Sequence, residues 1–221
     1  MQFTFDLSHE TAFGRSDFLA SDSNAVALGW IDRWPEWPCP ALALYGPAGC
    51  GKTHLVHLWR ARTSSVIVPG ETLSEELAAR LASEQRYRVA IDDADRASER
   101  ALLHLFKLCL ENRGNVLLAA RLPPASWTVA LPDLGSRLRA VLAVGIEPPD
   151  DALLGAALVK QFSDRQLHVP RDVIGYLIKH MERSFAAAAD TTARLDSASL
   201  SESRAITVPL ARRILAEAGV Y

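Results

Sequence analysis

The chain has few cysteines, no long apolar run and no secretory pattern at its N-terminus, and each absence excludes a class of protein. Its three cysteines, Cys39, Cys50 and Cys109, lack the spacing of a metal site, so we interpret them as free thiols in a reducing compartment. No apolar stretch approaches the roughly 18 residues that cross a bilayer. The first residues lack the cationic and apolar runs of a signal peptide. We therefore expect a cytoplasmic protein without a membrane segment.

An excess of basic charge is also missing. Lys and Arg number 24 against 26 Asp and Glu, which gives a formal net charge of -2. Proteins that read DNA commonly carry a basic surface, so the overall charge does not support direct sequence-specific DNA binding. Hydrophobic residues make up 49% of the 221 residues, which is typical of a globular protein with one or two domains.

Short apolar runs alternate with helical patterns between residues 41 and 146. The five expected strands are 41–45, 64–68, 88–91, 116–120 and 140–146. Helical patterns with one apolar face lie between them, for example at Leu102, Phe106 and Leu110. Strands that alternate with helices form parallel βαβ units. The sequence therefore predicts an α/β fold with a doubly wound, five-stranded parallel sheet.

The pattern changes at the Pro148-Pro149 pair. Beyond it only helical periodicity remains, in about four segments, which predicts a small all-helical domain. The expected organisation is an N-terminal peptide at 1–12, an α/β core at 13–148 and the helical domain at 149–221.

Residues 46–53 read GPAGCGKT and match the P-loop pattern in full. Glycines at this spacing let backbone N–H groups turn toward phosphate oxygens at the start of a helix. In such a loop Lys52 reaches the β and γ phosphates, and the hydroxyl of Thr53 coordinates Mg²⁺. A chance glycine-rich turn is the alternative, but the strand before the loop and the helical run after it favour a nucleotide site. The predicted nucleotide-binding residues of this region are Gly46, Pro47, Ala48, Gly49, Cys50, Gly51, Lys52, Thr53 and His54.

Acidic residues end the third expected strand, at the edge of the sheet where the P-loop is expected. We predict that Asp92 joins Thr53 in the Mg²⁺ shell and that Asp93 orients the attacking water if the site is active. A helix-capping acidic turn is the alternative. The expected cofactors are ADP or ATP with Mg²⁺.

Two segments resemble the nucleotide site of the AAA+ family that includes DnaA and Hda. The stretch YGPAGCGKTH at 45–54 is similar to the P-loop of that family. Residues 17–27 resemble the segment with which the family encloses the adenine, which implies nucleotide contacts from Phe18 and Asn24. The resemblance extends to the end of the chain and implies that the helical domain is a lid beside the nucleotide.

A third segment resembles the arginine-finger region of the same family. Ser136-Arg137 precedes a strand that runs into VGIEPP at 144–149. The resemblance implies that Arg137 reaches across an interface to the γ-phosphate of ATP held by DnaA. Two alternatives stay open: Arg139 lies on the same side of an extended segment and could take this role, and Arg137 could be a surface residue paired with Asp133.

The resemblance is closest in layout to the Hda-type regulators of DnaA. Only about twenty residues separate the second and third expected strands, too few for the helical insertion with which an initiator grips origin DNA. Counterparts of a C-terminal helix-turn-helix domain and of an N-terminal helicase-loading domain are also missing. We therefore expect a core and a lid without a DNA-binding domain.

The first residues read Gln2-Phe3-Thr4-Phe5-Asp6-Leu7, a glutamine followed by alternating apolar side chains. An extended peptide of this kind fits an apolar pocket with a polar rim. It is similar to the peptide with which Hda binds the DNA polymerase sliding clamp, although Asp6 stands where proline is frequent. The predicted clamp-binding residues are Gln2, Phe3, Phe5 and Leu7. The alternative is an N-terminal strand with one buried face.

Two departures from the family pattern predict weak intrinsic hydrolysis. After the fourth strand the family places a polar group near the γ-phosphate, but this chain reads Ala119-Ala120-Arg121. The third lid helix usually begins with an arginine near the nucleotide, whereas this chain has Ser184-Phe185-Ala186 with Arg183 displaced. Whether the chain is itself an enzyme stays open.

These features together predict a regulator that limits the initiation of chromosomal replication. Its expected partners are DnaA and the sliding clamp, and a homo-oligomer is a further candidate assembly. Two hypotheses from other classes stay open: an autonomous P-loop ATPase or helicase loader of the DnaC type, and a DNA-binding fragment of an initiator.

Overall fold

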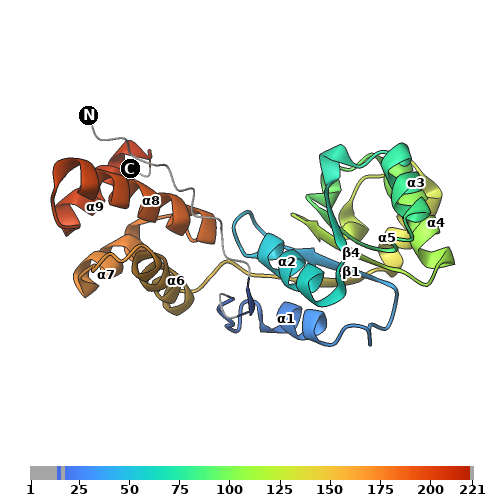
Figure 1. Cartoon of the computed structure of the whole chain (residues 1–221), viewed down its shortest axis with the longest axis horizontal. Helices are drawn as coiled ribbons and strands as arrows, with labels where there is room; N and C mark the ends of the chain where they lie inside the picture. Colours follow the sequence, from blue (N-terminus) through green and yellow to red (C-terminus); the bar gives the residue numbers. More distant parts are fainter. Residues whose placement is uncertain (1–13, 16–17, 220–221) are drawn as a thin grey trace.

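A five-stranded parallel sheet forms the centre of the larger domain in the computed structural model, which describes residues 14–15 and 18–219 (Figure 1). The strands are β1 (Ala41–Tyr45), β2 (Val66–Pro69), β3 (Arg88–Asp92), β4 (Asn115–Ala120) and β5 (Leu142–Gly145). Their order in the sheet is β2-β3-β4-β1-β5, and every neighbouring pair is parallel. The predicted fold class is confirmed.

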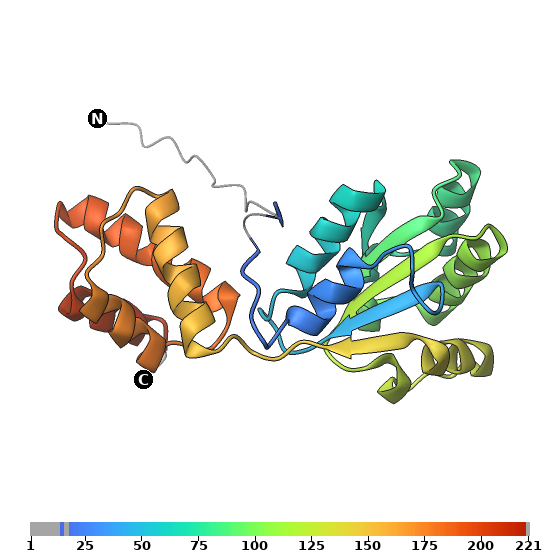
Figure 2. The same cartoon turned by 90° about the horizontal axis from the view of Figure 1, so that it is seen from below.

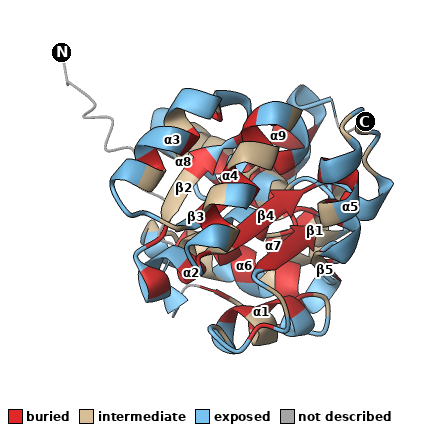
Figure 3. Ribbon diagram, turned by 90° about the vertical axis from the view of Figure 1, so that its right-hand side faces the viewer, coloured by how far each residue is buried: buried red, intermediate tan, exposed pale blue. Residues whose placement is uncertain are grey.

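Helices cover both faces of this sheet. One face carries α1 (Ala25–Asp32) and α2 (Lys52–Thr63), and the other carries α3 (Glu75–Ser83), α4 (Glu99–Glu111) and α5 (Pro132–Ala140). Three short 3₁₀ turns lie in the connections, namely η2 (Gly70–Thr72), η3 (Ala94–Arg96) and η4 (Pro124–Ser126). Because both faces are covered, the central strands β4 and β1 are apolar and buried along most of their length, as Figure 3 shows.

Alternate residues of β1 face the two halves of the core. Leu42 and Leu44 pack with the fully buried Trp59 of α2, whereas Ala43 packs with Phe106 of α4 on the other face. Successive side chains of a strand point to opposite faces, so a single apolar run serves both layers. Trp37, in the connection before β1, stacks on Trp59 at a centroid distance of 5.5 Å and closes the α1–α2 side.

Two predicted strands begin later in the structure than in the sequence analysis. Ser64 adopts a left-handed conformation that ends α2, so β2 starts at Val66 rather than at residue 64. The prediction for β5 was wrong in a similar way, because Ala140 is the last residue of α5 and β5 starts at Leu142. Arg137 and Arg139 therefore lie in a helix and not in an extended segment.

Four helices form the second domain. They are α6 (Asp151–Asp164), α7 (Arg171–His180), α8 (Phe185–Glu202) and α9 (Val208–Glu217). Their buried faces form a separate core that includes Leu158, Leu177 and Leu195. The domain lies beside the end of the sheet at which the strands finish (Figure 2). Within the described residues, no helix has the length and apolarity needed to cross a bilayer.

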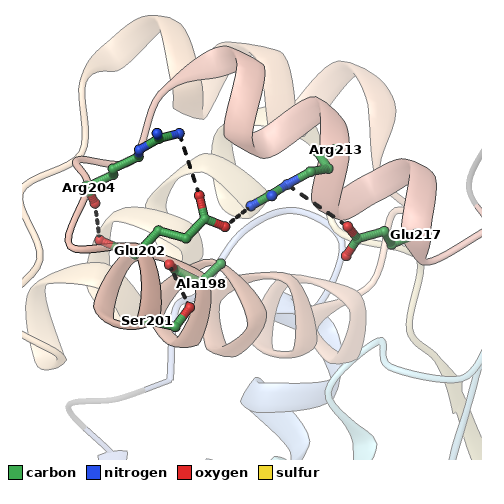
Figure 4. A network of polar contacts seen from close by, with 7 residues as sticks. Ala198, Ser201, Glu202, Arg204, Arg213 and Glu217 are labelled. Atoms are coloured by element: carbon green, nitrogen blue, oxygen red, sulfur yellow. Dashed lines mark hydrogen bonds and ion pairs between the residues drawn. The ribbon is translucent and has the colours of Figure 1, made fainter.

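A surface network joins the end of α8 to α9 (Figure 4). The carboxylate of Glu202 accepts a hydrogen bond from Arg213 and lies 3.8 Å from the guanidinium of Arg204. This contact with Glu202 raises the pKa of Arg213 above its ordinary value. The side chains are largely exposed, so the network contributes little to the stability of the lid.

Candidate functional site

The P-loop connects the end of β1 to the start of α2. Gly49 has a φ of 69° and Gly51 a φ of 105°, both in the left-handed region that side chains disfavour. Among the described residues, no acceptor faces the backbone N–H groups of residues 48–51. These N–H groups and the positive end of α2 form an arrangement that binds phosphate.

Lys52 lies inside the loop rather than on its surface. Its side chain is buried, and Nζ donates hydrogen bonds to the carbonyl oxygens of Gly46 at 2.8 Å and Pro47 at 2.7 Å. The ammonium is thereby held beside the backbone of the loop. A phosphate bound there would compete with the two carbonyl oxygens for the same cation.

The structure brings together Thr53 and Asp92, the two predicted Mg²⁺ ligands. The hydroxyl of Thr53 donates to Oδ2 of Asp92 at 2.8 Å, and Oδ1 of Asp92 accepts from the backbone N–H of Asp93 at 3.2 Å. Oxygen donors of this kind suit Mg²⁺, which completes its shell with phosphate oxygens and water. No larger cluster of metal-binding side chains exists within the described part of the chain, so a metal here would depend on the nucleotide.

Asp93 and His57 complete the polar surroundings of Asp92. Asp93 is half-buried and has a left-handed backbone, which turns the chain from β3 into η3. Burial lowers the pKa of His57, and Arg60 acts in the same direction, whereas the charge of Asp92 opposes both. The surroundings of His57 therefore favour its neutral form.

The segment that precedes α1 lies against the start of α2. Phe18 is buried, and its ring meets the ring of His54 edge-on at 5.1 Å. Asn24 is also buried: its Oδ1 accepts from the N–H of Ser21, and its Nδ2 donates to the carbonyl of Leu19, both at 3.0 Å. Asn24 thus shapes the segment next to the P-loop helix and leaves no amide atom pointing outward.

The first turn of α8 rests directly on the P-loop, a contact that the sequence analysis missed. The backbone N–H of Phe185 donates to the carbonyl of Gly49 at 2.9 Å. A Cβ at Gly49 would lie 2.7 Å from Cβ of Ser184, and a Cβ at Gly51 would lie 3.6 Å from the ring of Phe185. The hydroxyl oxygen of Ser184 accepts a hydrogen bond from the backbone N–H of Ala187 and so caps the N-terminus of α8. The start of α8 and the phosphate loop are therefore in direct contact.

The positions from which the family sends polar groups to the γ-phosphate are apolar here. Ala119 and Ala120 are fully buried at the end of β4, and Arg121 is exposed. Arg183 forms an ion pair with Asp151 at the start of α6, with an N–O distance of 2.7 Å. Among the described residues, neither Arg121 nor Arg183 forms a hydrogen bond with the P-loop.

The helix that carries Arg137 lies at the opposite end of the core (Figure 2). Leu142, at the start of β5, pairs with Leu42 at the start of β1, whereas the P-loop follows the far end of β1. Four residues of parallel strand separate the two edges by about 13 Å. Arg137 therefore lies far from the P-loop of its own chain.

Arg137 and Arg139 point to different sides of α5, because residues two apart on a helix do not face each other. Arg137 is half-buried and Arg139 is exposed. Within the described residues, Arg137 has no ion pair or hydrogen bond, and it does not pair with Asp133.

The predicted clamp-binding residues Gln2, Phe3, Phe5 and Leu7 lie outside the described residues.

Residues 151–215 match the family model described as the lid domain of Hda. The fold is similar to domain III of the replication initiation protein DnaA from Thermotoga maritima, with a TM-score of 0.79, 16% identity, and coverage of 94% of this chain and 97% of that one. The Thermotoga maritima RuvB branch migration motor matches with a TM-score of 0.72 and 15% identity over 92% of this chain and 71% of that chain.

AMPPCP-bound DnaA from Aquifex aeolicus matches with a TM-score of 0.66 and 18% identity over 84% of this chain and 65% of that chain. Identities this low establish the fold and no more. The chain therefore has the fold of domain III of DnaA, and residues 151–215 within it match the lid domain of Hda.

Proposed function

We propose that the chain is a regulator of replication initiation that binds ADP or ATP with Mg²⁺ and promotes hydrolysis of ATP bound to DnaA. One observation carries the proposal. Arg137 lies at the end of the core remote from the P-loop of its own chain and has no polar partner among the described residues. An arginine so placed is free to act on a nucleotide held by another molecule.

Nucleotide binding rests on the P-loop and its neighbours. Lys52 and the N–H groups of the loop would hold the phosphates, and Thr53 and Asp92 would hold Mg²⁺ between them. The segment around Phe18 would line the adenine side. Because α8 begins on Gly49, nucleotide bound here would link the lid to the core. The apolar end of β4 favours slow hydrolysis of the chain's own nucleotide.

Arg137 would stabilise the transition state on the partner. Its guanidinium would approach the γ-phosphate of ATP held by DnaA, where negative charge develops on the oxygens as the phosphoryl group departs. A planar, permanently charged group suits this task, and lysine would replace it poorly. Such a residue accelerates hydrolysis by about 10³-fold or more.

The N-terminal residues Gln2, Phe3, Phe5 and Leu7 would bring the protein to the sliding clamp on DNA. An alternating apolar peptide behind a glutamine fits the kind of pocket that binds such motifs. Deletion of residues 1–7 should abolish binding to the clamp without reducing the affinity for ADP.

The test is hydrolysis of labelled ATP preloaded on DnaA, in the presence of clamp-loaded DNA. Wild type should accelerate it, Arg137→Ala should not, and Arg137→Lys should restore little of the effect. Arg139→Ala is the matched control, since it removes the same charge from another side of the same helix. Equal acceleration by wild type and Arg137→Ala would overturn the role of Arg137. Turnover by the chain alone, without DnaA, would point instead to an autonomous ATPase.

A further inference from the structure

The start of α5 is held by a carboxylate that belongs to another helix. Oε1 and Oε2 of Glu99 accept from the backbone N–H of Ala130 at 2.9 and 3.0 Å, and Oε2 also accepts from the N–H of Leu131 at 3.0 Å. Glu99 is the first residue of α4, so one half-buried side chain joins the N-terminal ends of two neighbouring helices.

Helix α5 has no capping side chain of its own. Leu131 occupies the N-cap position without a side-chain acceptor, and Pro132 at the next position has no N–H to donate. The N–H groups of Ala130 and Leu131, which lead into the helix, are the two donors that Glu99 binds. A carboxylate at this place also interacts favourably with the positive ends of both helix dipoles.

The apolar contacts of α5 constrain its position along the core less strictly than the hydrogen bonds to Glu99 do. Leu134 and Leu138 are buried against the α4 face of the sheet, together with Trp127 and Val129 from the preceding loop. Apolar contacts of this kind are non-directional. Hydrogen bonds to a single carboxylate are directional and fix Leu131, the N-cap residue, about 9 Å, or six residues, before Arg137.

We propose that Glu99 is a positioning residue for Arg137, an inference that rests on the function proposed above for Arg137. Glu99 fixes the start of α5 against α4, and α5 carries Arg137 toward the partner's γ-phosphate. Glu99 itself touches neither nucleotide. Without the Glu99 carboxylate, Arg137 is still present but α5 can shift. Small displacements of a catalytic group reduce reaction rates strongly.

The test compares Glu99→Gln with a matched variant, Glu111→Gln. Glutamine keeps the size of the side chain but turns an N–H₂ group toward one of the two backbone donors. Glu111 lies at the other end of α4, is exposed and makes no polar contact within residues 18–219, so its variant makes the same change in charge without touching α5. Each is assayed for acceleration of DnaA-bound ATP hydrolysis over a range of concentrations.

Glu99→Gln should lower the maximal stimulated rate about tenfold, while the concentration that gives half of this rate changes by less than about twofold. Glu111→Gln should match the wild type in both. Glu99→Asp, which keeps both oxygens on a shorter stem, should restore part of the rate. Affinity for ADP at the opposite end of the core should be the same in all variants.

Amide hydrogen exchange supplies a readout that does not depend on activity. The N–H groups of Ala130 and Leu131 should exchange faster in Glu99→Gln than in wild type or Glu111→Gln, and thermal unfolding should show that all variants are folded. A full stimulated rate in Glu99→Gln, with Arg137→Ala inactive, would overturn the positioning role alone. A lowered rate without faster exchange at α5 would also overturn it. No stimulation by the wild type would overturn the proposed function, and this inference with it.

Discussion

The two ends of the core differ in how their charged groups are used. At the end where the strands finish, Lys52 binds loop carbonyls, Thr53 binds Asp92, and the lid rests on Gly49. At the other end, Arg137 projects from α5 with no polar partner among the described residues. The polar groups at the P-loop end are preorganised by bonds within the chain, whereas Arg137 is held by its helix and left without a polar partner among the described residues.

This difference means that the two ends should be separable by mutation. A variant at the P-loop end should alter the binding of nucleotide to this chain. A variant at the α5 end should alter hydrolysis on the partner and leave that binding intact. The sheet between them is buried on both faces.

The largest effect is expected from Lys52→Ala. A hydrogen bond to a charged group contributes about 1.5–3 kcal/mol, so the loss of the contact between Lys52 and the β-phosphate should weaken ADP binding by about 10-fold to 100-fold. Calorimetric titration with ADP and Mg²⁺ measures this affinity. Arg137→Ala is the control and should bind ADP as the wild type does. Unchanged affinity in Lys52→Ala, or lost affinity in Arg137→Ala, would show that the two ends are not separate.

A smaller effect is expected from Gly49→Ala. The new Cβ would face Cβ of Ser184 at 2.7 Å, and the backbone φ of 69° disfavours any side chain. The free energy of unfolding should fall by about 1–3 kcal/mol, and ADP should bind more weakly because the lid is displaced. Gly175→Ala is the matched control in the lid: no atom lies within 4 Å of its added Cβ, so this helical site should gain about 0.5–1 kcal/mol. Urea unfolding measures both values.

The smallest effect concerns pH at the P-loop end. Burial, together with Arg60, holds the pKa of His57 in the folded chain below its ordinary value of 6.5. As the pH falls below 6.5, His57 takes up a proton more readily in the unfolded chain than in the folded chain. Protonation therefore favours the unfolded chain, and the free energy of unfolding decreases as the pH falls. The loss of unfolding free energy between about pH 7.5 and about pH 5.5 should be smaller in His57→Gln than in wild type. An identical loss in the two proteins would contradict this assignment.

Much of the P-loop end could be predicted because its signals are local. The GPAGCGKT run, the apolar strand before it and the acidic pair at the end of β3 each lie within a few consecutive residues. Parallel pairing then brings the ends of β1 and β3 to one edge, which is why Thr53 and Asp92 meet.

The contacts that could not be predicted join residues remote in sequence. Phe185 reaches Gly49 from the other domain, and Glu99 reaches Ala130 across a strand and a loop. The sequence around Phe185 or Glu99 does not specify which distant residue each of them contacts. The helix that contains Arg137 could have been predicted from two local signals. Leu134 and Leu138 are four residues apart, and Pro132 is suited to the first position of a helix.

The most direct test of the central claim uses a transition-state analogue on the partner. DnaA loaded with ADP, Mg²⁺ and aluminium fluoride imitates the charge of the departing phosphoryl group, and an arginine finger binds that state more tightly than the ground state. Wild type should bind this form of DnaA more tightly than DnaA with a non-hydrolysable ATP analogue, and Arg137→Ala should bind both alike. Equal binding of the two forms by wild type, with ADP bound normally at its own P-loop, would contradict the account.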